Sequence, residues 1–99
     1  MRDVINKLTM SVQVVDFYAD WCGPCVAMTP VIEELEKELA GSVEIKKIDV
    51  DQNQEEASKY GVMSIPTYLI LKDGKEVDRF VGVTSKEVMK QKLSRHVSS

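Results

Sequence analysis

The chain of 99 residues contains two cysteines, and both lie in the segment Cys22-Gly23-Pro24-Cys25. A disulfide between sulfurs so close in sequence opens and closes with little rearrangement of the backbone. Closing so short a loop restricts the unfolded chain very little, so such a bond contributes little to stability. The spacing therefore favours thiol–disulfide exchange, in which a thiolate attacks a sulfur of another disulfide.

The two cysteines differ in their expected surroundings. Pro24 is typical of the first turn of a helix, where unpaired backbone amides and the helix dipole favour an anion. Cys22 lies at this helix start, so its thiol pKa should be lowered and its thiolate should be the nucleophile. Cys25 lies one turn into the helix and should be more buried, which makes it the resolving thiol. Cys22 would form a mixed disulfide with a target, and Cys25 would then attack Cys22 and release the reduced target.

Two other uses of the cysteine pair remain open. A structural disulfide is disfavoured by the small loop that it would close. A zinc site is the other alternative, because Cys-x-x-Cys is half of many zinc sites. The sequence has no second cysteine pair, and its single histidine, His96, is expected to be a solvated residue of the last helix. We therefore expect no metal.

Helical spacing of apolar residues predicts three helices. The longest covers residues 24–40 and is followed by a glycine, a typical helix terminator. Asp51, with Gln54 three residues later, resembles a capping box and predicts a short helix to about residue 59. A last helix is capped by residues 84–87, and its inner face should carry Met89, Leu93 and Val97.

Runs of β-branched and aromatic residues predict four strands, at residues 12–18, 43–50, 67–71 and 76–81. An Asp73-Gly74 turn should join the last two as an antiparallel hairpin. The resulting order is β-α-β-α-β-β-α, and each β-α-β crossover implies a parallel pair of strands. We expect one α/β domain over residues 1–99, an α/β/α sandwich around a mixed sheet of about four strands.

Composition narrows the range of functions. Sixteen acidic and 13 basic residues leave a net charge of -3, and without a basic patch this argues against a nucleic-acid partner. No apolar stretch approaches the roughly 18 residues that a membrane span needs, and the first residues do not resemble a signal peptide. We therefore expect a cytoplasmic protein, in a compartment where disulfides are usually catalytic or transient. We also expect it to be a monomer.

With a strand before it and a helix after it, the segment Trp21-Cys22-Gly23-Pro24-Cys25 resembles the active-site motif of the thioredoxin family residue for residue. The resemblance covers residues 12–97 and continues through Asp16-Phe17, Asp49-Val50-Asp51, Tyr60-Gly61-Val62, Ile65-Pro66-Thr67 and Val81-Gly82. It implies a thioredoxin-like fold and a redox-active disulfide, Cys22–Cys25, with no bound cofactor.

The resemblance also implies roles for residues outside the motif. Asp16 matches a buried acid that helps to deprotonate the resolving cysteine, and burial should raise its pKa into the range for proton transfer. From the strand pattern alone, Asp16 could equally be a solvent-facing residue. Lys47 matches a lysine near this acid, although its position alone predicts only an exposed side chain. Pro66 matches a cis-proline that faces the two cysteines.

A surface that contacts target proteins is implied as well. The backbone of Ser64 and Ile65, just before the proline, would offer an edge to an extended segment of the target. Trp21, Pro24 and Gly82 would border this surface. Trp21 could equally be a packing residue, and Gly82 could be no more than a turn glycine.

Two features depart from the family pattern. Only 11 residues precede Val12, too few for the usual first strand and helix, so we expect residues 1–11 to be an abbreviated N-terminal segment. Without that strand, the strand at 43–50 lies at an exposed edge, where Lys46 and Lys47 discourage pairing with another chain. Val26 stands where the family commonly has Lys or Arg, so one cation that stabilises a thiolate is missing.

The function implied by the resemblance is that of a protein thiol-disulfide oxidoreductase that reduces disulfides in target proteins. Gly23 and Pro24 between the cysteines go with reductants in this family, and an oxidase or isomerase of the same fold is the alternative. The sequence carries no flavin or nucleotide motif, so electrons would come from an external reductase of the thioredoxin-reductase type. A non-catalytic interaction module with the same fold is the remaining alternative.

Overall fold

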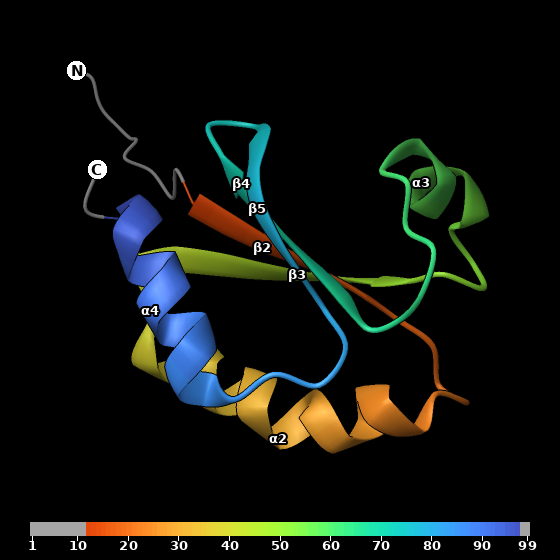
Figure 1. Cartoon of the computed structure of the whole chain (residues 1–99), viewed down its shortest axis with the longest axis horizontal. Coiled ribbons are helices and arrows are strands. Elements are labelled where there is room, and N and C mark those ends of the chain that lie inside the picture. The colour runs from red at the N-terminus through yellow and green to blue at the C-terminus, as the bar shows by residue number, and fades with distance from the viewer. Residues whose placement is uncertain (1–11, 98–99) are drawn as a thin grey trace.

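The structure is a computed structural model and describes residues 12–97. These residues form strands and helices in the order that the sequence predicts (Figure 1). The elements are β2 (Val12–Tyr18), α2 (Gly23–Glu38), β3 (Val43–Asp49), α3 (Gln54–Lys59), β4 (Thr67–Lys72), β5 (Lys75–Val81) and α4 (Lys86–Val97).

The strands of residues 12–97 form one mixed, four-stranded sheet in the order β3-β2-β4-β5. β2 and β3 run parallel, whereas β4 runs antiparallel to both β2 and β5. The expectation that the second β-α-β unit is also a parallel crossover is therefore wrong. With six residues, α3 is about 9 Å long, too short to carry the chain back along β3, which is about 23 Å long. β4 consequently begins near the end of β3 and runs the opposite way.

Helices cover both faces of the sheet, α2 and α4 on one side and α3 on the other (Figure 1). Side chains alternate along β2, so Val12 and Val14 pack in the cluster under α2 and α4, while Val15 and Phe17 pack in the cluster on the α3 side. The first cluster also contains Met28, Ile32, Leu35, Val43, Tyr68, Ile70, Phe80, Met89 and Leu93. The predicted α/β/α sandwich is confirmed.

The start of α4 agrees with the prediction, whereas the start of α3 and the end of α4 differ from it. The N-cap of α3 is Asn53, not Asp51, and the Asn53 side chain makes no capping hydrogen bond. α4 begins after Ser85, whose Oγ accepts a hydrogen bond from the Val88 amide at 3.2 Å. Val97 is 40% exposed, so its predicted place on the inner face is wrong. It is the final residue of α4, so it lies at the end of the helix and not along its inner face.

His96 is not the solvated residue that the sequence predicts. Its side chain is 22% exposed, and its Nε2 lies 3.6 Å from Asp78 Oδ2. The ammonium of Lys72 also donates a hydrogen bond to the His96 carbonyl at 2.6 Å. These contacts join the end of α4 to the β4–β5 hairpin, and they form only because the fold returns α4 to strands that lie far away in sequence.

Within residues 12–97, β3 lies at an edge of the sheet. Lys46 and Lys47 on this strand are exposed. The predictions of an abbreviated N-terminal segment and a missing first strand concern residues 1–11, which lie outside the described residues. No helix in the described part of the chain has the length and apolar character needed to cross a membrane.

Candidate active site

The cysteine pair lies where β2 gives way to α2. The chain turns after β2, and the Cys22 amide donates a hydrogen bond to the Ala19 carbonyl at 3.2 Å. Cys22 is the N-cap of α2, with an extended backbone conformation, and Pro24 occupies the first turn. The amide of Cys25 donates to Cys22 Sγ at 3.2 Å. The Cys22 sulfur therefore takes the place of a capping acceptor for an otherwise unpaired helix amide.

Cys22 and Cys25 are joined by a disulfide. Cys22 is 4% exposed and Cys25 is 8% exposed, so the expectation that Cys25 is the more buried of the two is wrong. Cys22 is covered by the segment before Pro66, and its Sγ lies 3.9 Å from the Ile65 carbonyl oxygen. Cys25 instead lines a cavity between α2 and the strands β2 and β3.

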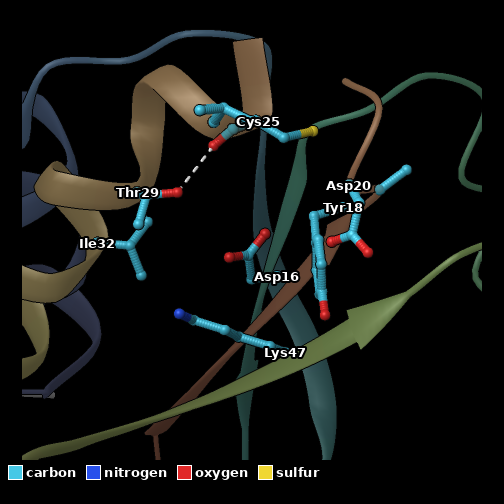
Figure 2. A pocket seen from close by; sticks show the side chains of 9 residues that line it. Asp16, Tyr18, Asp20, Cys25, Thr29, Ile32 and Lys47 are labelled. Carbon is cyan, nitrogen blue, oxygen red and sulfur yellow. Dashed lines mark hydrogen bonds between the residues drawn. The ribbon is translucent and has the colours of Figure 1, made fainter. Parts of the chain in front are cut away.

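That cavity contains Asp16 and has a volume of about 190 Å³. In Figure 2 the Asp16 carboxylate lies below the first turns of α2, with Cys25 above it and Lys47 on the opposite side. Asp16 is 6% exposed, and its Oδ1 has no hydrogen-bond partner. Burial raises the pKa of Asp16 to about 6, against the opposing charge of Lys47. The alternative of a solvent-facing Asp16 is ruled out.

The position of Asp16 follows from the alternation of β2. It continues the row of Val12 and Val14 that faces α2, and it pairs with Lys47 on β3 and with Tyr68 on β4. The Lys47 residue is exposed, but its side chain lines the cavity (Figure 2). The structure thus brings the predicted acid, lysine and resolving cysteine together around one cavity.

Thr29 is a lining residue that sequence reasoning missed. Its Oγ1 donates a hydrogen bond to the Cys25 carbonyl at 3.4 Å, and the side chain borders the cavity with Asp16 (Figure 2). The signal was present, because Thr29 lies one helical turn after Cys25 and so belongs to the same face of α2.

The Ile65–Pro66 peptide bond is cis, as predicted. Two hydrogen bonds hold the surrounding backbone. The hydroxyl of Thr67 donates to the Ser64 carbonyl, and the amide of Gly82 donates to the Pro66 carbonyl at 2.9 Å. Gly82 has a φ of +88°, a left-handed conformation that favours glycine. The backbone before Pro66 therefore lies over the Cys22 sulfur, with Gly82 beside it.

An apolar groove of about 340 Å³ is lined both by Trp21 and by Ser64 and Ile65, which are two of the predicted contact regions. Trp21 is 70% exposed, so the alternative of a packing residue is wrong. Its Nε1 donates a hydrogen bond to Asp51 Oδ2 at 2.7 Å, a partner that sequence reasoning assigned to a helix cap. The groove is lined by Trp21, Val50, Ala57, Val62, Met63, Ser64 and Ile65.

The other predicted residues lie at the surface around the pair. Gly23 and Pro24 are exposed on the first turn of α2, and a Cβ on Gly23 would meet no atom within 4 Å. Val26, which follows Cys25 and stands where the expected cation is missing, is 59% exposed. Within residues 12–97, no cluster of three or more His, Cys, Asp or Glu could hold a metal ion.

These features define a class of proteins that exchange thiols and disulfides. A disulfide closes a loop of four residues at the start of a helix. The buried carboxyl of Asp16 shares a cavity with Cys25, and the segment before the cis-proline covers Cys22. The redox-active group of such a site is the disulfide itself.

Comparison with known proteins narrows this class. The family model described as Thioredoxin matches residues 2–95. Thioredoxin of Bacillus subtilis is 52% identical over 86 residues, which cover 87% of this chain and 83% of that protein. Thioredoxin of Staphylococcus aureus is 47% identical over 95 residues, covering 96% and 91% of the two chains. The solved structure of Fasciola hepatica thioredoxin has a TM-score of 0.82 and 47% identity, covering 92% of this chain and 86% of that one.

The chain therefore belongs to the thioredoxin family. It is a thiol-disulfide oxidoreductase, and the Cys22–Cys25 disulfide is its redox-active group.

Proposed function

We propose that this protein reduces disulfides in target proteins, with Cys22 as the nucleophile and Cys25 as the resolving thiol. The observation that carries the assignment is the hydrogen bond from the Cys25 amide to Cys22 Sγ at the N-cap of α2. An amide donor and the positive end of the helix dipole stabilise negative charge on that sulfur, which favours the Cys22 thiolate as the attacking group in the reduced protein.

The proposed reaction has two exchange steps. The Cys22 thiolate attacks one sulfur of the target disulfide, and the other target sulfur leaves as a thiolate that takes a proton. The Cys25 thiolate then attacks Cys22 Sγ in the mixed disulfide, and the second target sulfur leaves. The target gains two electrons and two protons, and the protein ends with the Cys22–Cys25 disulfide.

Asp16 is the proposed acceptor for the Cys25 proton in the second step. The support is that its raised pKa, about 6, lies close to neutral pH, where a base accepts and returns protons readily. Oδ1 of Asp16 is free of protein partners and shares the cavity with Cys25. Lys47 tunes this acid, because its charge lowers the Asp16 pKa and opposes the effect of burial.

The proposed target contact is the surface between the groove and Gly82. An extended target segment would lie along the backbone of Ser64 and Ile65, and main-chain hydrogen bonds of this kind tolerate many target sequences. Trp21, with its exposed indole, would border one side, and Gly82 the other. Exposed Met63, 94% accessible, extends the apolar part of this surface.

The proposed setting is a cytoplasmic, monomeric single domain that an external reductase of the thioredoxin-reductase type regenerates. Support comes from the sequence, which carries two cysteines, both in the redox pair, and no other disulfide framework. The relatives named above are thioredoxins, for which such a reductase is the family expectation.

Replacing each cysteine in turn tests the roles. Cys22→Ser should abolish reduction of a protein disulfide such as insulin. Cys25→Ser should still react but stop at a mixed disulfide with the target, visible by non-reducing electrophoresis and removed by dithiothreitol. Turnover by Cys22→Ser, or a trapped complex in that variant instead, would reverse the assignment.

An oxidase or isomerase role is the competing proposal, and the exposed Val26 is the feature that raises it. A cation after Cys25 would stabilise a thiolate, so its absence affects the reduction potential of the Cys22–Cys25 pair, and a measurement of that potential tests the two roles. Equilibration with reduced and oxidised glutathione separates the roles, because a reductant stays oxidised until glutathione is almost fully reduced. A pair that glutathione reduces easily would favour the oxidase, and a pair inert toward insulin would favour a non-catalytic interaction module.

A further inference from the structure

Arg79 on β5 makes contacts that the mechanism above does not use. Its Nη2 donates a hydrogen bond to the Tyr60 carbonyl at 2.7 Å, and its Nη1 donates to the Gly61 carbonyl at 3.4 Å. Tyr60 is the C-cap residue of α3. A guanidinium therefore binds carbonyls that the helix itself leaves unpaired at its C-terminal end, where positive charge is favourable.

Glu76 holds the same guanidinium from the other side. Its Oε2 accepts from Arg79 Nε at 2.7 Å, and its Oε1 accepts from Arg79 Nη2 at 3.0 Å. Two parallel hydrogen bonds between a carboxylate and a guanidinium fix the orientation of the planar group. The side chains are only about one-third exposed, 31% for Arg79 and 35% for Glu76.

A β-bulge in β5 makes this pairing possible. Residues three apart on a regular strand point to opposite faces of the sheet. Here Arg79 pairs with Leu69 and Glu76 pairs with Leu71, with a register irregularity between them at Val77. Leu69 and Leu71 both belong to the core cluster on the α3 side. The extra residue therefore brings Glu76 and Arg79 onto one face, which is the face that α3 covers.

The carbonyls that Arg79 binds begin the segment that leads to the cis-proline. Gly61 reverses the chain with a φ of +66°, and residues 62–65 then line the apolar groove beside Cys22. Met63 and Ser64 are exposed, so little packing fixes them. The hydrogen bonds from Arg79 tie the start of this segment to the sheet, while Pro66 and Gly82 tie its end.

We propose that Arg79, oriented by Glu76, is a positioning residue that sets the place of residues 62–65 and so determines how tightly target proteins bind. This inference rests on the proposed function, in which the Ser64–Ile65 backbone contacts the target. The side-chain hydrogen bonds of Arg79 go to Glu76, Tyr60 and Gly61, and none of them goes to either cysteine. Loss of Arg79 should weaken recognition of a polypeptide and leave thiol chemistry in place.

The test compares a protein disulfide with a small one in the full chain. Arg79→Gln should raise KM for insulin about fivefold, the effect of roughly one lost hydrogen bond, with kcat nearly unchanged. The rate with 5,5′-dithiobis(2-nitrobenzoic acid), which has no peptide backbone to bind, should change by less than about twofold. Amide hydrogen exchange at Met63 and Ile65 should become faster.

Two further variants separate charge from geometry. Arg79→Lys keeps the charge but loses the planar fork, so it should show most of the KM increase. Glu76→Gln leaves Arg79 in place but loosens its orientation, and it should show a smaller increase. Lys75→Gln, an exposed change on the same strand, is the matched control and should alter neither substrate.

Several outcomes would overturn the inference. An unchanged KM for insulin in Arg79→Gln and Glu76→Gln would do so, as would a lower melting temperature with normal kinetics and normal exchange at residues 62–65, since the pair would then be only structural. Failure of the unmodified protein to react with the small disulfide would instead contradict the proposed function. The two failures are therefore distinguishable.

Discussion

Asp16 is a carboxyl that the fold places in an apolar row of β2, behind Val12 and Val14 and under α2. Its Oδ1 has no hydrogen-bond partner, and ionising a buried carboxyl without such partners costs free energy. The pKa of about 6 is the direct consequence. The residue thus lowers the stability of the protein at neutral pH while it supplies a base near the cysteines.

The stability cost of Asp16 should depend on pH. Its folded pKa of about 6 lies above the ordinary value of 3.8, so between these values the folded state binds the proton more tightly than the unfolded state does. The stability that the protonated Asp16 gives the folded state is therefore fully present below about pH 4, and it is lost as pH rises through 6. Asp16→Asn should gain about 2–3 kcal/mol over the original protein at pH 8 and little at pH 4.

Urea unfolding of the oxidised proteins from pH 4 to pH 8 measures this difference. Asp20→Asn removes an exposed carboxylate that lines the same cavity, and it serves as the control that keeps Asp16. A stability gain of Asp16→Asn that is equal at both ends of the pH range would show that the carboxyl is not the source.

At the scale of the elements, the loop after β5 depends on one backbone conformation. Gly82 has a φ of +88°, and its amide hydrogen bond to Pro66 joins β5 to the cis-proline segment. Gly23, by contrast, begins α2. A Cβ added at either glycine would meet no atom within 4 Å, so the two positions differ in backbone conformation and not in space.

Alanine substitutions should separate these two positions. Gly82→Ala should destabilise the protein by about 1 kcal/mol, because alanine disfavours a positive φ. Gly23→Ala should be neutral or slightly stabilising, because alanine is the better helix former. Chemical unfolding of both oxidised variants checks this, and equal losses in the two would contradict an origin in backbone conformation.

At the scale of the whole molecule, two core clusters share the central strands β2 and β4. Because both clusters are built on the same strands, loss of either should unfold the other. The protein should therefore behave as one cooperative domain.

A substitution far from the cysteines tests this cooperativity. Met89 on α4 is 0% exposed, and Met89→Ala should cost about 2–4 kcal/mol through the cavity that it leaves. The fluorescence of Trp21, the only tryptophan in the sequence, reports unfolding at the cysteine end, and it should shift together with far-ultraviolet circular dichroism. Val88→Ala, at a position 42% exposed, is the control and should shift neither curve much. Separate transitions from the two probes would indicate more than one folding unit.

Much of the fold follows from local patterns in the sequence. Alternating and helical spacing of apolar residues predicted the order of the elements in residues 12–97 and most of their bounds, because burial of one face imposes these periods. Local patterns did not predict that β4 runs antiparallel to β3. That direction depends on the point at which the chain leaves α3. This point is set by the length of the helix and by the place where α3 packs on the sheet.

Cys22 and Cys25 show the same division within the site. Their spacing and the proline between them indicated thiol–disulfide exchange and the helix start that favours a Cys22 thiolate, since these are properties of neighbouring residues. The tertiary structure decided their burial, because Ile65 covers Cys22 and the Asp16 cavity opens beside Cys25. It also decided the partner of Trp21 and the contacts of Arg79, since both join residues far apart in sequence. Such contacts depend on strand order and register, which only the packed chain determines.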